Sequence, residues 1–238
     1  MDKRPIGIID SGLGGLAIAE AIWKELPYES TLYLADHAYF PYGDKTAEQI
    51  NSRLPRLIGW LVKRKVKIVV IACNTITMAT IKSLRQRYPL PFIGTEPAVK
   101  PALAFSQAVI LTTVTTAKHL KKQAGILIYP CPGLAEAIEA ESGNKLKATI
   151  KGYLDKIPGK YSALVLGCTH YILVKGIISK LVGKKIKVIE PSAEIARQTR
   201  SVLEKKGLLN LNGKPGRKFY TTGPDRRVKG IIFSRCSL

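Results

Sequence analysis

Short apolar runs rich in Ile and Val alternate along this sequence with longer segments of helical periodicity. Several runs are apolar throughout, which is typical of strands buried on both faces of a parallel sheet. The alternation therefore predicts an α/β fold with mainly parallel sheets. The predicted strands are Ile6–Ile9, Leu32–Ala35, Ile68–Ala72, Phe92–Gly94, Val109–Leu111, Ile126–Tyr129, Ala163–Gly167, Lys187–Ile189 and Phe219–Thr221.

One predicted helix contains a proline within its apolar repeat. Leu54, Leu57, Ile58 and Leu61 recur at the spacing of a single helix face. Pro55 lies inside this repeat, and proline lacks the N–H that a helix interior requires. We therefore expect the preceding helix to end or kink near Leu54.

One strand pattern occurs twice. It stands in IVVIACNT (Ile68–Thr75) and again in ALVLGCTH (Ala163–His170). Each copy combines an apolar strand, a small residue, a cysteine and an Asn or Thr that opens a helix. The repeat predicts two similar α/β halves of the flavodoxin-like type, related by pseudo-symmetry, with the active site between them. Each half places one cysteine, Cys73 or Cys168, at the carboxyl end of a strand.

Proline residues indicate where one half gives way to the other. Pro97 and Pro101 interrupt the chain between two predicted strands. We predict that the first half comprises residues 1–97 and about 200–238, and that the second half comprises residues 98–199. This division requires the end of the chain to return to the first half.

The composition excludes several classes of protein. The chain has 238 residues, of which 46% are hydrophobic and 23% charged, so it is neither disordered nor a disulfide-stapled miniprotein. No apolar run approaches the roughly 20 residues needed to cross a bilayer. The start MDKRPIGIID leads directly into a strand without room for an export signal, so we expect a cytoplasmic protein with reduced cysteines. Neither the cysteines nor the three histidines (His37, His119, His170) have zinc-ligand spacing, and no metal is expected.

The formal net charge of +21 is unusually high. A charge of this size permits binding to nucleic acid or to another polyanion. The basic residues are scattered, however, and recur where helix C-termini are expected, which favours a solvated basic surface. Nucleic acid is therefore a possible partner but not the expected one, and salt-sensitive binding to DNA would distinguish the two hypotheses.

Polar residues follow several predicted strands, where ligands bind in open α/β sheets. The clusters are Asp10-Ser11-Gly12, Asp36, Pro41-Tyr42-Gly43, Cys73-Asn74-Thr75, Glu96, Cys168-Thr169-His170 and Glu190. One of them belongs to the glycine-rich run DSGLGG (Asp10–Gly15), which opens a helix whose free N–H groups attract anions. The run has neither of the common nucleotide-binding patterns, so a small carboxylate suits it as well as a phosphate.

The cysteines divide into two kinds. Cys73 and Cys168 stand in matching contexts, and a helix N-terminus or a cation such as His170 lowers a thiol pKa from its usual value of about 8.5. Two matched thiols favour a site with a proton donor on one face and an acceptor on the other. A redox pair that forms a reversible disulfide is the alternative. Cys131 and Cys236 lack such polar neighbours and are interpreted as ordinary buried residues.

Several motifs in order, spread over nearly the whole chain, carry a resemblance to a known family. They are IGIIDSGLGGL (Ile6–Leu16), LADHAYFPYGDKT (Leu34–Thr46), VIACNT (Val70–Thr75), IGTEPAVKPA (Ile93–Ala102), LGCTHY (Leu166–Tyr171), IEPSAEIAR (Ile189–Arg197) and YTTG (Tyr220–Gly223). With these motifs the chain resembles the cofactor-independent glutamate racemases of the aspartate/glutamate racemase superfamily. Thr115 stands where this family usually has Gly, and Ile172 where it usually has Pro.

The resemblance implies an isomerase that interconverts L- and D-glutamate by proton transfer at the α-carbon, without pyridoxal phosphate or another cofactor. By resemblance, Cys73 removes the proton from D-glutamate and Cys168 removes it from L-glutamate. Asp10 assists on the Cys73 side, and His170 assists on the Cys168 side. Glu139, which follows a Cys-Pro pair as a carboxylate does in the family, acts near Cys168.

The resemblance also assigns substrate-binding residues, whose hydroxyl, amide and backbone N–H groups suit the two carboxylates and the ammonium of glutamate. These residues are Ser11, Tyr42, Gly43, Asn74, Thr75, Thr116 and Thr169. The resemblance further implies a homodimer that supplies D-glutamate for peptidoglycan. The nearest alternative is a racemase of aspartate or another amino acid with the same mechanism. A basic nucleic-acid-binding protein on a racemase scaffold is a second alternative.

Overall fold

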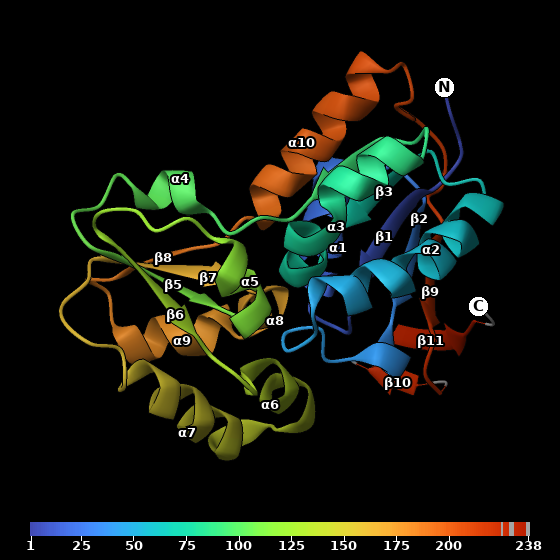
Figure 1. Ribbon diagram of the computed structural model, residues 1–238. Helices are drawn as coiled ribbons and strands as arrows, with labels where there is room; N and C mark the ends of the chain where they lie inside the picture. The colour runs from blue at the N-terminus through green and yellow to red at the C-terminus, as the bar shows by residue number, and fades with distance from the viewer. Residues whose placement is uncertain (225, 229–230, 237–238) are drawn as a thin grey trace.

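Two mainly parallel β-sheets form the framework of the molecule (Figure 1). The structure is a computed structural model, and it describes residues 1–224, 226–228 and 231–236. The predicted α/β fold is confirmed. The first sheet contains β1 (Ile6–Asp10), β2 (Thr31–Ala35), β3 (Ile68–Ile71), β4 (Phe92–Gly94), β9 (Arg217–Thr221), β10 (Arg226–Val228) and β11 (Ile231–Arg235). The second sheet contains β5 (Ala108–Thr112), β6 (Ile126–Pro130), β7 (Ala163–Gly167) and β8 (Lys187–Ile189). Residues 225, 229–230 and 237–238 of the predicted first half lie outside the described residues.

Helices connect most of the strands. They are α1 (Leu16–Glu25), the 3₁₀ helix η1 (His37–Tyr39), α2 (Ala47–Lys63), α3 (Asn74–Arg87), α4 (Val99–Ala102), α5 (Val114–His119), α6 (Leu134–Ala140), α7 (Gly143–Leu154), α8 (Thr169–Leu173), α9 (Lys175–Val182) and α10 (Ser192–Lys205). Figure 1 shows the second sheet with α7 and α9 on the left, and the first sheet with both ends of the chain on the right.

The two sheets repeat one arrangement of strands. Four neighbouring strands of the first sheet run in the order β2-β1-β3-β4, and the second sheet runs in the order β6-β5-β7-β8, all parallel. The registers also match, since Ile6 of β1 pairs with Ile68 of β3 and Ala108 of β5 pairs with Ala163 of β7. Strands β3 and β7 therefore occupy equivalent places, as the repeated sequence pattern predicts.

Burial explains why the central strands are apolar throughout. β1, β2, β3, β5 and β7 are buried along their whole length. One continuous apolar cluster contains residues of both halves, such as Ile8 of β1 and Leu164 of β7. Each buried methylene contributes about 0.8 kcal/mol of transfer free energy, so this shared core holds the two halves together.

The end of the chain returns to the first sheet. β9 pairs in parallel with β2, from Thr31 opposite Arg217 to Ala35 opposite Thr221. The preceding helix α10 packs on α1 of the first half and begins at Ser192. The division of the chain into two domains stays a prediction, and the packing of α10 favours a boundary nearer Ser192 than residue 200.

Helix α2 corrects one prediction. It does not end at Leu54 but continues through Pro55 to Lys63. A capping box fixes its start, because the Thr46 side chain accepts from the Gln49 backbone N–H and the Gln49 side chain accepts from the Thr46 N–H. The predicted apolar face of the helix is buried, and this burial outweighs the hydrogen bond that proline cannot make.

Candidate active site

The two matched cysteines occupy equivalent strand ends. Cys73 follows β3 and precedes α3, whereas Cys168 follows β7 and precedes α8, as the sequence predicts. Both are free thiols, and their exposed fractions are only 5% and 6%. Both line one narrow pocket between the two halves, which is partly open to solvent.

The pocket gathers many of the predicted site residues. Those that line it are Ser11, Tyr42, Gly43, Cys73, Thr75, Cys168 and His170. The other predicted residues do not line it but contact or adjoin residues that do: Asp10, Asn74, Thr116, Glu139 and Thr169. Sequence reasoning did not assign the remaining lining residues, which are Phe40, Pro41, Asp44, Thr113, Val114, Cys131, Pro132, Gly133, Ala135 and Glu136. These come from loops and helix starts, where no local pattern distinguishes a lining residue from an ordinary turn residue.

The Cys73 thiol is strongly desolvated. Burial raises the pKa of Cys73 to about 12, and the negative charge of Asp10 acts in the same direction. A contact with Ser11 opposes this rise but does not cancel it. The Ile76 N–H at the start of α3 does lower the Cys73 pKa, as expected, but burial and Asp10 outweigh it, so the net shift is upward. Cys73 is a neutral thiol at pH 7.

Asp10 connects the two halves from a fully buried position. Its Oδ2 accepts a hydrogen bond of 3.0 Å from the Gly12 N–H, and its Oδ1 accepts one of 3.3 Å from the Thr169 hydroxyl. Thr169 opens α8 beside Cys168, whereas Asp10 ends β1 of the first half. The carboxylate is thus held near both cysteines.

A histidine and a carboxylate lie on the Cys168 side. His170 Nδ1 is 3.9 Å from the Cys168 sulfur, and His170 Nε2 is 2.8 Å from Oε1 of Glu139. Burial alone lowers the pKa of His170, but its contacts with Cys168 and Glu139 raise it to about 10. Burial raises the pKa of Glu139, yet its histidine contacts hold it well below the usual range. His170 is therefore an imidazolium at neutral pH, paired with the Glu139 carboxylate.

The glycine-rich run DSGLGG contacts the carboxylates of Asp10 and Glu139. The Gly12 N–H donates to Asp10 and the Leu13 N–H donates to Oε1 of Glu139 at 2.7 Å, so carboxylates of the protein occupy these anion-binding donors. A Cβ at Gly12 would lie 2.1 Å from the same Oε1, and a Cβ at Gly14 would lie 2.6 Å from His170 Nδ1. Glycine at these positions lets the first half approach the Glu139–His170 pair closely.

Tyr42 reaches the pocket from a buried ionic cluster. Its hydroxyl donates to Asp36 Oδ2 at 2.6 Å, and Arg53 binds both oxygens of the same carboxylate. Burial and the Asp36 charge raise the Tyr42 pKa above its ordinary value. The neighbouring Gly43 carbonyl accepts from the Thr115 N–H at 2.9 Å, which joins the loop to α5 of the second half. This pairing fixes Tyr42 as a neutral hydroxyl at the pocket wall.

Three threonines form a cluster of hydroxyls. The Thr75 oxygen lies 3.0 Å from that of Thr113 and 3.2 Å from that of Thr116, and the last two are 3.0 Å apart. Next to it, Asn74 donates through Nδ2 to the Thr95 carbonyl, while its Oδ1 has no hydrogen-bond partner among the described residues. A buried acceptor of this kind is available to a cationic donor such as an ammonium.

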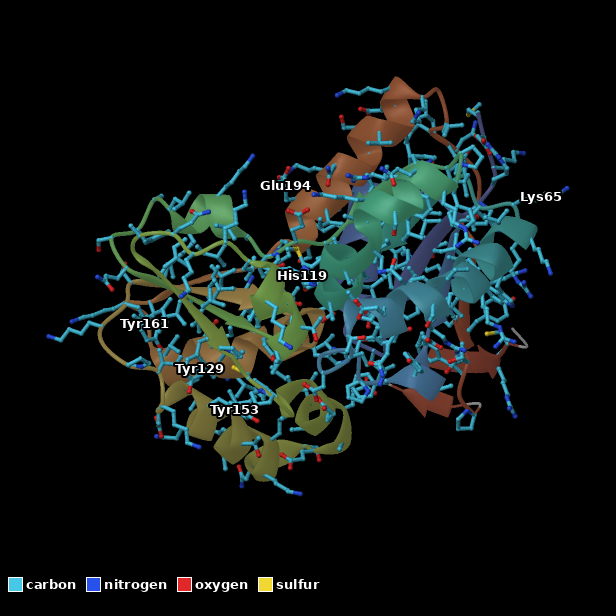
Figure 2. All side chains as sticks on the ribbon, viewed as in Figure 1. Lys65, His119, Tyr129, Tyr153, Tyr161 and Glu194 are labelled. Atoms are coloured by element: carbon cyan, nitrogen blue, oxygen red, sulfur yellow. The ribbon has the colours of Figure 1, made fainter. Side chains whose placement is uncertain are left out.

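Cys131 is buried, as interpreted from the sequence, but it also lines the pocket. It does so together with the two matched cysteines, and burial followed by the proximity of Cys168 raises its pKa to about 12. Tyr153 of α7 donates to the Pro132 carbonyl and so holds the adjoining wall (Figure 2). Cys236 is buried outside the pocket lining, where its N–H donates to Thr221.

The described part of the chain contains neither a metal-binding cluster nor a membrane-spanning helix. Within residues 1–224, 226–228 and 231–236, no group of three or more His, Cys, Asp or Glu side chains is arranged to hold a metal ion. No helix in these segments has both the length and the apolar character that crossing a membrane requires.

Two similar α/β halves, each with a cysteine at an equivalent strand end beside a shared pocket, are the architecture of an isomerase of the racemase class. The family model for Asp/Glu/hydantoin racemases matches residues 6–199. The chain belongs to this family, which confirms the resemblance seen in the sequence motifs.

Known relatives and solved structures agree with this assignment. The chain is 37% identical to a glutamate racemase of Pseudomonas paraeruginosa, over 97% of this chain and 93% of the relative. It is 38% identical to a glutamate racemase of Stutzerimonas stutzeri, over 96% of this chain and 92% of the relative. The structure of a glutamate racemase isoform of Bacillus anthracis superposes with a TM-score of 0.87 at 28% identity, covering 100% of this chain and 98% of that one. That of a Francisella tularensis glutamate racemase in complex with D-glutamate has a TM-score of 0.81 at 29% identity, covering 94% and 90%.

Proposed function

We propose that this protein interconverts L- and D-glutamate by proton transfer at the α-carbon, with Cys73 and Cys168 as the two acid–base groups. The observation that carries the proposal is the placement of both thiols on one pocket, from equivalent strand ends of the two halves. A proton can then leave one face of the α-carbon and return to the other. The similarity to glutamate racemases supports glutamate as the substrate.

The proton transfers balance without a cofactor. A cysteine thiolate takes the α-proton, and the C–H electron pair stays on the α-carbon as a carbanion. The opposite thiol then protonates the other face and becomes the thiolate. Cys168 acts on L-glutamate and Cys73 on D-glutamate. Each turnover leaves Cys168 and Cys73 with exchanged protonation states. The reverse turnover, or proton exchange of the two sulfurs with solvent, restores the starting state.

The surroundings of the two thiols determine which one accepts a proton and which one donates it when L-glutamate reacts. The His170 imidazolium, held by Glu139, stabilises negative charge on the nearby Cys168 sulfur. Cys73 stays protonated because it is buried beside Asp10, so it is the proton donor when L-glutamate reacts. A buried, preorganised site is needed for this chemistry, since losing one such donor typically costs about 2.7–4 kcal/mol of transition-state stabilisation.

The remaining predicted residues suit the charged groups of glutamate. Hydroxyls and backbone N–H groups bind its carboxylates; these residues are Ser11, Tyr42, Gly43, Thr75, Thr116 and Thr169. The free Oδ1 of Asn74 accepts from the ammonium, and Asp10 adds a compensating charge. We further propose that the enzyme acts in the cytoplasm as a homodimer and supplies D-glutamate for peptidoglycan.

Exchange in deuterated water tests this function. L-glutamate incubated with the protein and no added cofactor should lose optical rotation while deuterium enters the α-carbon. Cys73→Ala and Cys168→Ala should each slow racemisation by about 10²–10⁴-fold, the usual contribution of a positioned acid–base group.

Elimination provides a control, because it needs only one base. Cys73→Ala should still eliminate chloride from a β-chloro analogue of L-glutamate, and Cys168→Ala from the D-analogue. Racemisation near the wild-type rate in either variant would refute the pairing. Faster turnover of L-aspartate than of L-glutamate would instead overturn the substrate assignment.

A further inference from the structure

The Glu139 carboxylate lies between two imidazoles. Its Oε1 accepts from the Leu13 N–H at 2.7 Å and is 2.8 Å from His170 Nε2. Its Oε2 is 3.4 Å from Nε2 of His37, whose side chain is 7% exposed. The sequence motifs do not assign a role to His37, and the proposed mechanism does not use it.

The hydrogen bonds around His37 indicate which nitrogen carries the proton. Thr221 Oγ1 accepts from the Gly223 N–H at 3.1 Å and lies 3.0 Å from His37 Nδ1. The Glu139 carboxylate can only accept, so the nitrogen that faces it is the one suited to carry the proton, and the Thr221 hydroxyl can then donate to Nδ1. The proton of a neutral His37 therefore sits on Nε2, the atom that faces Glu139.

Two aromatic side chains pack against the His37 ring. The ring is enclosed by Phe40 at 6.5 Å and Phe233 at 6.2 Å between centroids, both edge-on. Its Nε2 makes no short hydrogen bond to any of the described residues. The acceptor that it faces is Oε2 of Glu139, at 3.4 Å. A separation of 3.4 Å is long for a strong hydrogen bond, and contacts of this kind shorten when substrate is bound.

This contact crosses from one half to the other. His37 and Thr221 follow or end strands of the first sheet, whereas Glu139 and His170 lie on α6 and α8 of the second half. We propose that His37 is a positioning residue, which donates its Nε2 proton to Glu139 and thereby holds that carboxylate against His170. The first half of the molecule then controls the charge beside Cys168. The inference rests on the proposed function, in which Cys168 is an acid–base group.

The charge balance explains why the contact matters. Cys168, Glu139 and Asp10 act on His170. The donors to Glu139 include His170 and the Leu13 N–H at Oε1, and His37 faces Oε2. The Nε2–H of His37 faces Oε2, whereas His170 contacts Oε1, so the two histidines bind different oxygens of the carboxylate. Without the His37 N–H, Oε2 stays buried and loses the donor that faces it. The Glu139 pKa then rises, and the His170 pKa falls.

Three variants test the role in catalysis. His37→Leu removes the donor, while His37→Gln keeps an N–H near the position of Nε2. We expect His37→Leu to lower kcat/KM by about tenfold, the fold-change for one hydrogen bond to a charged group, and to move the alkaline limb of its pH profile to lower pH. His37→Gln should restore both. His119→Gln is the matched control, since His119 is exposed at the end of α5 (Figure 2).

A measurement on the wild-type protein separates this inference from the proposed function. The chain contains three histidines, so nitrogen NMR of the labelled protein resolves each ring. We expect a proton on Nε2 of His37, and His170 as an imidazolium at pH 7.5. An Nδ1–H tautomer of His37 would overturn the inference even if racemisation is confirmed. An unchanged pH profile in His37→Leu would also overturn it, as would additive losses of kcat/KM in the double variant His37→Leu/Glu139→Gln. Absence of racemisation in the wild-type protein would instead refute the proposed function.

Discussion

At the scale of single residues, two thiols of the same type sit in opposite electrostatic surroundings. Cys73 is desolvated next to a carboxylate, which favours its neutral form. Cys168 instead has Nδ1 of the His170 imidazolium 3.9 Å from its sulfur. A reaction that needs one donor and one acceptor at the same time benefits from this asymmetry. Asp10 and His170 therefore matter because of where they place charge.

The His170–Glu139 pair makes stability depend on pH. Folding raises the His170 pKa from 6.5 to about 10, so the native state holds this proton more tightly than the unfolded chain does. Its contribution is complete below about pH 6.5 and declines as pH rises toward 10, with a slope of at most about 1.4 kcal/mol per pH unit. Urea unfolding between pH 6.5 and 8.5 measures the slope. His170→Asn should remove it, whereas the exposed control His119→Asn should keep it; an equal slope in both variants contradicts the assignment.

The site could be predicted only where a local pattern exists. Cys73 and Cys168 are detectable because an apolar strand, a cysteine and a helix start recur in the same order. His37 and Cys131 carry no such pattern, since their relevant neighbours, Glu139 and Cys168, are distant in sequence. The net upward shift of the Cys73 pKa was not predicted, because its burial and the approach of Asp10 are properties of the tertiary structure.

At the scale of secondary-structure elements, the central strands were the most predictable part of the fold. A strand buried on both faces needs apolar side chains at every position, and this leaves a continuous signal in the sequence. β10 (Arg226–Val228) is the edge strand of the first sheet, and β11 (Ile231–Arg235) lies between it and β9; neither was predicted. An edge strand is held mainly by backbone pairing, which no local residue pattern records.

Helix α2 shows how tertiary packing overrides a local preference. Pro55 is half-buried inside a continuous helix, and it leaves the Asn51 carbonyl without its usual helical donor. Pro55→Ala restores that N–H, and we expect the free energy of unfolding to rise by about 2 kcal/mol after allowing for the lower chain entropy of proline. Urea unfolding checks the value. Arg56→Ala, at the exposed neighbouring position, should change stability by less than about 0.5 kcal/mol. A loss of stability in Pro55→Ala would show that the proline ring is itself needed for packing.

At the scale of the whole molecule, the two halves are built on one plan but completed differently. Both use the strand order second-first-third-fourth, which brings β3 and β7 to equivalent places and their cysteines to one pocket. Only the first sheet is extended by the end of the chain, through β9. The sequence repeat predicts the shared plan. The position of α10 depends on its packing against α1, which the repeat does not encode.

A buried ion pair joins the distant parts of the first half. Lys67, at the start of β3, lies 2.6 Å from Glu29 Oε2 and donates at 2.7 Å to the carbonyls of Asp2 and Leu208. Glu29 Oε1 accepts from the Asn210 N–H at 2.8 Å. Both charged side chains are almost fully buried, so neither has water to replace its partner. The pair therefore connects the first residues, the centre of the sheet and the segment that returns after α10.

Removing one member of this pair should destabilise the whole molecule. Lys67→Met leaves the buried Glu29 carboxylate without its cation, and we expect a loss of about 3–5 kcal/mol in the free energy of unfolding. Lys67→Met/Glu29→Leu should recover much of that loss, because a buried ion pair is worth little more than an apolar pair of similar size. Lys65→Met is the control, since Lys65 is exposed two residues earlier (Figure 2). Urea unfolding of the three variants measures the differences. Equal stability of Lys67→Met and Lys65→Met would mean that the segments on either side of Lys67 hold together by apolar packing alone.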